Sequence, residues 1–136
     1  MDVTFSPALR VYAEMWEIAG RRREADAQFA QALAHIRSGT PDAMAKAFDL
    51  FKRSGAHNFT EAQFAAGWCC EHGCGTKRNY PQDIRWYKRA AEAGSDAAMS
   101  RLAQIYEADK HYKEAARWYR RYAAERIRWR NQRLNW

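Results

Sequence analysis

Residues 62–98 read AQFAAGWCCEHGCGTKRNYPQDIRWYKRAAEAGSDAA, and this stretch carries the clearest structural pattern in the chain. Alanines alternating with long polar side chains favour helix. The stretch therefore predicts a helix over 61–72 and a second over 82–93. Gly94 is a natural stop for the second helix, and the glycines and proline of 73–81 predict one long loop between the two. The unit is a helix–turn–helix.

Parts of this unit recur along the chain. The tripeptide Ala-Gln-Phe occupies 27–29 and again 62–64, which lie 35 positions apart. A second motif, Leu-Phe-Lys-Arg at 50–53, corresponds to Trp-Tyr-Lys-Arg at 86–89, which lies 36 positions later. It corresponds again to Trp-Tyr-Arg-Arg at 118–121, which lies 32 positions after the second copy. Offsets in the thirties match the length of one helix-pair repeat in a solenoid.

Helix-start and helix-stop signals outline the rest of the chain. Pro7 and Pro41 each fit the first position of a helix, and Thr40 can cap the second of these. About seven helices are expected, with those outside the opening stretch at 7–20, 24–38, 41–54, 96–108 and from 111 onward. They form a single domain, 1–136, made of a leading helix (1–23), three repeats (24–123) and a basic, Trp-containing C-terminal cap (124–136).

Composition supports one helical domain with a real core. Hydrophobic residues make up 47% of the 136 positions and aromatic residues 14%, whereas Gly and Pro number only 7 and 3. These values argue against disorder and against an all-β fold. No signal-peptide pattern or membrane span is found in the sequence. The three cysteines are an odd number crowded into six positions, which is a poor basis for disulfides and predicts a reducing, cytoplasmic setting. The net charge of +7 falls entirely within 85–136.

The opening stretch resembles a Sel1-like repeat. The matching features are Gly67 in the first helix, the loop Gly73-Cys74-Gly75, the pair Trp86-Tyr87, the pair Ala90-Ala91, and Gly94. A shortened second copy covers 98–123 and a degenerate one 27–55. The resemblance implies an all-α, right-handed α-solenoid of about three repeats. It also implies a non-catalytic adaptor or scaffold without cofactor, a type of protein that is often bacterial.

The same resemblance implies where a partner protein would bind. In such solenoids the first helices of successive repeats form a concave groove, so we expect aromatic side chains there to supply contact area. Two acidic residues are expected to supply charge selection. The candidate partner-binding residues are Phe29, Leu33, Phe64, Trp68, Glu71, Gln104 and Glu107.

The C-terminal segment offers an alternative site. Four aromatic residues recur at helical spacing on one stripe, and an adjacent stripe is basic. A capping helix with aromatics inward is the favoured interpretation; a homodimer seam and a nucleic-acid surface stay open. The aromatic stripe is Trp118, Tyr122, Trp129 and Trp136, and the alternative basic surface is Arg126, Arg130 and Arg133.

A second alternative is a metal- or thiol-dependent protein that uses residues 69–74. Cys69, Cys70, His72 and Cys74 resemble zinc ligands, but zinc sites usually draw two spaced pairs from different segments. Lys77 and Arg78 would favour a Cys74 thiolate. The histidines are scattered and no nucleophile motif accompanies them. We therefore expect neither a metal site nor an enzyme.

Overall fold

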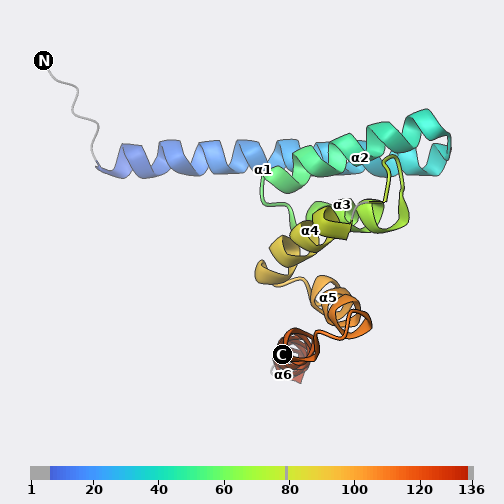
Figure 1. The fold of residues 1–136 in the computed structure, drawn as a ribbon. Helices are drawn as coiled ribbons and strands as arrows, with labels where there is room; N and C mark the ends of the chain where they lie inside the picture. Colours follow the sequence, from blue (N-terminus) through green and yellow to red (C-terminus); the bar gives the residue numbers. More distant parts are fainter. Residues whose placement is uncertain (1–6, 79, 135–136) are drawn as a thin grey trace, which may run out of the picture.

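The computed structural model describes residues 7–78 and 80–134, with side chains described over 19–78 and 81–134. Within these ranges the chain forms six helices and no strand, which confirms the all-α prediction (Figure 1). The helices are α1 (Pro7–Ser38), α2 (Pro41–Ala56), α3 (Thr60–His72), α4 (Tyr80–Glu92), α5 (Asp96–Ala108) and α6 (Tyr112–Leu134).

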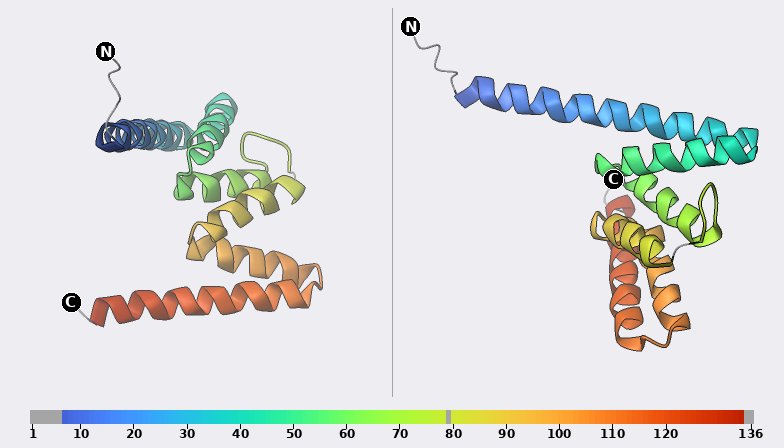
Figure 2. Two further views of the ribbon diagram at one scale, coloured as in Figure 1. Left: turned by 90° about the vertical axis from the view of Figure 1, so that its left-hand side faces the viewer. Right: turned by 45° about the horizontal axis from the view of Figure 1, so that its top comes forward.

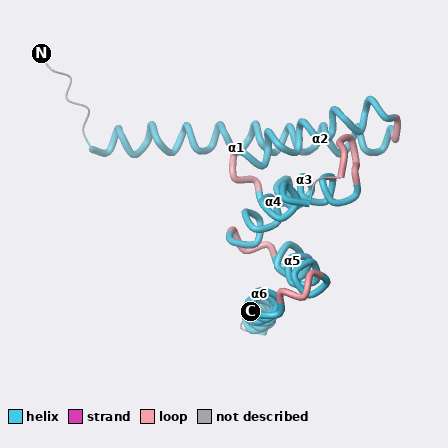
Figure 3. The backbone as a smooth tube through the Cα atoms, in the orientation of Figure 1, coloured by secondary structure: helices cyan, strands magenta, loops and turns pink. Residues whose placement is uncertain are grey.

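The helices stack as three pairs, α1/α2, α3/α4 and α5/α6. The principal contacts join each helix to its neighbours along the chain, as expected for a solenoid. The two views of Figure 2 place α1 and α6 at opposite ends of the stack. Short connections join most helices, and the one long loop lies between α3 and α4, as predicted (Figure 3).

The predicted break between helices at 20–24 is wrong. Helix α1 runs without interruption for 32 residues, so the leading helix and the first helix of the first repeat are one element. A single Gly inside a helix costs only about 1 kcal/mol, and the three arginines that follow Gly20 are good helix formers. No proline is present there to remove a backbone hydrogen bond. The N-terminal half of α1 extends beyond the end of α2 (Figure 1).

The predicted Thr40 cap is confirmed, and two further caps mark helix ends. The Thr40 side chain accepts a hydrogen bond from the Ala43 N–H at 3.2 Å, and Ser95 does the same for the Ala98 N–H at 3.2 Å. Gly73 ends α3 in the left-handed conformation with φ 71°, which glycine adopts without strain. These caps mark the start of α2, the end of α3 and the start of α5.

Two apolar clusters form the core. The first lies among α1, α2 and α3 and includes Phe51 and Cys69; the second joins α4, α5 and α6 through Tyr87, Leu102 and Trp118. Small residues let the helices approach closely. At Gly67 a Cβ atom would lie only 2.7 Å from the ring of Tyr87, so the α3–α4 crossing requires glycine. This explains the first glycine of the repeat motif.

Candidate functional site

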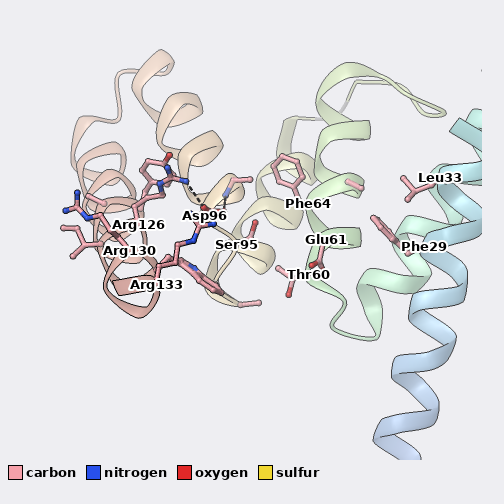
Figure 4. Close-up of a pocket in the computed structure, with 18 residues that line it drawn as sticks. Phe29, Leu33, Thr60, Glu61, Phe64, Ser95, Asp96, Arg126, Arg130 and Arg133 are labelled. Atoms are coloured by element: carbon pink, nitrogen blue, oxygen red, sulfur yellow. Dashed lines mark hydrogen bonds and ion pairs between the residues drawn. The ribbon is translucent and has the colours of Figure 1, made fainter. Parts of the chain in front are cut away.

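A groove of about 1270 Å³ opens between the two ends of the stack (Figure 4). Residues of α1 and α3 form one wall, and the second half of α6 forms the other. The turn between α4 and α5, residues 93–97, lies between the two walls. The groove is therefore assembled from elements that are distant in sequence.

The wall formed by α1 and α3 is mainly apolar, with one carboxylate, that of Glu61. It contains Phe29, Leu33 and Phe64, three of the predicted partner-binding residues. Ring contacts hold both phenylalanines: Phe29 packs edge-on against Phe59 with centroids 5.0 Å apart, and Phe64 packs against Tyr87 at 5.5 Å. Leu33 is exposed. Such fixed, partly exposed apolar side chains lose little entropy when they are covered by a partner.

The opposite wall is basic, with apolar side chains such as Ile127 and Trp129 between its arginines. Arg126, Arg130 and Arg133 follow one another at helical spacing on the face of α6 that lines the groove, beside the exposed Trp129. Arg126 lies 3.8 Å from the Asp96 carboxylate at the start of α5. The alternative basic surface thus forms part of the same groove as the predicted aromatic residues. From sequence alone, the two sets of residues had been alternative sites.

Three other predicted partner-binding residues lie elsewhere. Trp68 is 43% exposed, but it stacks on His72, with centroids 4.3 Å apart, outside the groove. Gln104 lines a smaller adjoining pocket of about 370 Å³. Glu107 accepts a hydrogen bond from the Tyr119 hydroxyl at 2.6 Å. These three residues do not contribute to the main groove.

A solved structure resembles the chain over most of its length. It is the crystal structure of a Sel1 repeat protein from Oxalobacter formigenes, which matches 74% of this chain and 43% of that one with a TM-score of 0.65 and 23% identity. The chain has the Sel1-like repeat fold. The fold expected from residues 62–98 is therefore confirmed.

A curated relative matches part of the chain. The chitin synthase regulator SKT5 of Malassezia restricta is 33% identical over 91 residues, which is 65% of this chain. The chain spans 6% of that relative's length. No protein-family model matches the present chain. None of the described helices contains a stretch long and apolar enough to traverse a lipid bilayer.

Glu71, the seventh predicted partner-binding residue, is buried in the Sel1-like stack, with 5% exposure. Its carboxylate accepts a hydrogen bond from the Tyr87 hydroxyl at 3.0 Å and another from Arg101 Nε at 2.9 Å, and it pairs a second time with the Arg101 guanidinium. The expectation that Glu71 selects partners by charge is wrong, because its charge is already satisfied. Glu71 instead ties α3 to α4 and α5.

Helix α6 packs on the rest of the Sel1-like stack through side chains in the first half of its length. Trp118 is buried and Tyr122 packs against the second core cluster, as predicted for inward aromatics. Trp129 is 59% exposed, and the second half of α6 lines the groove. Trp136 lies outside the described residues.

The cysteines near the repeat loop are core residues. Cys69 and Cys70 are buried, and burial raises the pKa of both thiols. Cys74 is also buried, with its Sγ 3.7 Å from Met44 Sδ. Arg78, one of the two basic residues expected to favour a Cys74 thiolate, donates from Nε to the Glu71 carbonyl at 3.1 Å. In the described part of the chain, no three His, Cys, Asp or Glu side chains are grouped to hold a metal ion.

Asp83 was not predicted from the sequence to be a special residue. It is fully buried near the start of α4, and its two carboxylate oxygens make no hydrogen bond among the described residues. Burial raises its pKa from the ordinary 3.8 to about 6, which the nearby Ile84 N–H only partly opposes. The folded protein therefore binds this proton more tightly than the unfolded chain does.

We expect Asp83→Asn to remove a pH dependence of stability. Because burial raises the pKa of Asp83 in the folded protein, ionisation of this carboxyl lowers the free energy of unfolding. The loss is absent below about pH 4, where the carboxyl is protonated in both the folded and the unfolded state, and it is complete above about pH 6. At about 1.4 kcal/mol per pKa unit, the wild type loses roughly 3 kcal/mol over that interval relative to the variant. Urea unfolding of both proteins across this pH range measures the difference. A difference that does not change with pH would contradict the assigned shift.

Proposed function

We propose that the protein is a non-catalytic scaffold that binds a segment of another protein in the groove between α1, α3 and α6. The observation that carries this proposal is the convergence of two residue sets in one groove. Phe29, Leu33 and Phe64 supply apolar contact area, and the α6 arginines supply oriented charge. Its support from known proteins is the Sel1-like fold, together with the partial match to a regulator protein.

Nucleic acid is the weaker candidate for the same groove. Arginines with an exposed Trp129 are a typical combination for single strands. However, the carboxylates of Glu61 and Asp96 also line the groove, and Asp96 already faces Arg126. A nucleic acid carries a phosphate at every nucleotide, which the carboxylates repel, whereas a polypeptide can place acidic residues beside the arginines and a basic residue beside Glu61. The mixed lining therefore favours a protein partner.

The cellular compartment, the source and the oligomeric state of the protein stay predictions of this proposal. Three unbridged cysteines fit a reducing, cytoplasmic compartment. One similar protein comes from Malassezia restricta and another from Oxalobacter formigenes, so a bacterial source also stays a prediction. A homodimer would use the exposed Ile127, Trp129 and Leu134 of α6, and it would show as a doubled mass in solution.

The proposal is tested by capture of partners with a groove variant. Leu33→Glu/Ile127→Glu replaces one exposed apolar residue on each wall of the groove, so folding should be preserved while partner binding is lost. Trp68→Glu is the matched control, because Trp68 is equally exposed but lies outside the groove. Quantitative mass spectrometry of bound proteins, after circular dichroism confirms folding, gives the readout.

We expect a set of bound proteins that the control retains and the groove variant loses. Partners that both variants retain would show that the groove is not the binding surface. Partners that only the Trp68 variant loses would move the site to the exposed face of α3.

A further inference from the structure

We infer that the occupant of this groove is an acidic amphipathic helix of the partner protein. This inference rests on the proposed function and specifies the chemistry of what binds. Both walls carry apolar side chains, but they differ in charge. The wall of α1 and α3 adds one carboxylate, Glu61, to its apolar side chains, whereas the wall of α6 adds three arginines. An occupant that satisfies both walls needs an apolar stripe beside an acidic stripe.

The arginines of α6 have capacity to bind carboxylates. The ion pair of Arg126 with Asp96 is long, at 3.8 Å, and both side chains are largely exposed. Arg130 and Arg133 form no ion pair within the described ranges 19–78 and 81–134. Guanidinium groups recognise carboxylates through paired hydrogen bonds, so an acidic partner gains contacts without displacing any from these two residues.

A short helix can match the length of the groove. Its basic wall follows residues 122–133 of α6, which spans about 17 Å at 1.5 Å per residue. About 11 residues of a partner helix cover this length.

The spacing of the charges also matches a helix. Arg126, Arg130 and Arg133 lie at positions i, i+4 and i+7 along α6. An antiparallel or parallel helix with Glu at the same spacing presents its carboxylates along one ridge. Its apolar residues at neighbouring helical positions then face Leu33 and Phe64 across the groove. Glu61 remains available for a basic residue at the opposite edge.

The test uses a designed helical peptide of about 14 residues with one Leu stripe and one Glu stripe, labelled with a fluorophore. The matched peptide has Lys in place of every Glu. Binding of both to the full chain is followed by fluorescence anisotropy. We expect the Glu peptide to bind and the Lys peptide to bind at least about tenfold more weakly.

Two charge-reversal variants identify the arginines that matter. Arg130→Glu/Arg133→Glu should weaken binding of the Glu peptide about tenfold and strengthen binding of the Lys peptide. Arg117→Glu/Arg120→Glu changes the net charge equally on exposed parts of α6 outside the groove, and it should leave both affinities within about twofold. Equal loss in both variants would overturn the inference in favour of unspecific electrostatic attraction.

Other outcomes separate this inference from the proposed function. If capture from lysate depends on Leu33 and Ile127 but the Glu peptide fails to bind, the groove still binds protein and the acidic helix is wrong. If neither result is obtained, both proposals fall. If a single-stranded oligonucleotide binds more tightly than the Glu peptide, and that binding is lost with Arg130→Glu/Arg133→Glu, the occupant is nucleic acid.

Discussion

Gly67→Val is expected to lower the stability of the protein by about 3 kcal/mol or more, the upper range for overpacking a core. A Cβ at this position would lie 2.7 Å, 2.8 Å and 3.1 Å from three ring carbons of Tyr87. Tyr87 is fully buried among α3, α4 and α5, and its hydroxyl is held by Glu71, so the ring has no space to retreat. The α3–α4 pair must therefore separate or tilt.

Thermal unfolding followed by circular dichroism measures this effect. A loss of about 3 kcal/mol corresponds to a fall in Tm of roughly 10 °C for a chain of this size. The control is Gly20→Ala, at a helical glycine where an added Cβ would meet no atom within 4 Å. That change should stabilise the protein by up to about 1 kcal/mol through helix propensity. An unchanged Tm for Gly67→Val would contradict the close α3–α4 approach.

Glu71→Ala should be the second strongly destabilising change, at about 2–3 kcal/mol. Removing one partner of a buried charge pair usually costs about 3–5 kcal/mol, and the lower figure applies here because the Arg101 side chain is 38% exposed. The change also leaves the Tyr87 hydroxyl without its acceptor inside the core. Urea unfolding at neutral pH gives the free-energy difference.

A double-mutant cycle with Arg101→Met separates the ion pair from the other contacts of Glu71. Once Glu71 is Ala, Arg101→Met should cost less than it does in the wild type, with a coupling energy of about 1–2 kcal/mol. Strictly additive effects would show that the pair contributes nothing to stability and that Glu71 acts through Tyr87 alone.

Local features of the structure were predictable from sequence because their causes are local. Thr40 and Ser95 cap helices through their own side chains, and Gly73 ends α3 through its own backbone conformation. The α1 helix was predicted wrongly for a related reason. Gly20 is a weak stop signal, and nothing in the neighbouring sequence reinforced it.

Features that depend on how repeats stack were not predictable. The partner of Glu71 is Arg101, 30 positions away in the next repeat, and helical periodicity says nothing about which long side chain reaches across. The convergence of Phe29 with Arg130 depends on the path of the chain through four intervening helices. The apolar and basic groups of residues could therefore be identified separately from sequence, but their meeting in one groove could not.

The five principal helix–helix interfaces follow one another in series from α1 to α6, each joining a helix to the next one along the chain. The distance between the apolar and basic walls depends on the angles at all of them, so a small tilt at each interface produces a large change at the opening. A partner molecule that contacts both walls connects the two ends of this series directly. It therefore restrains every interface at once, including those that it never contacts.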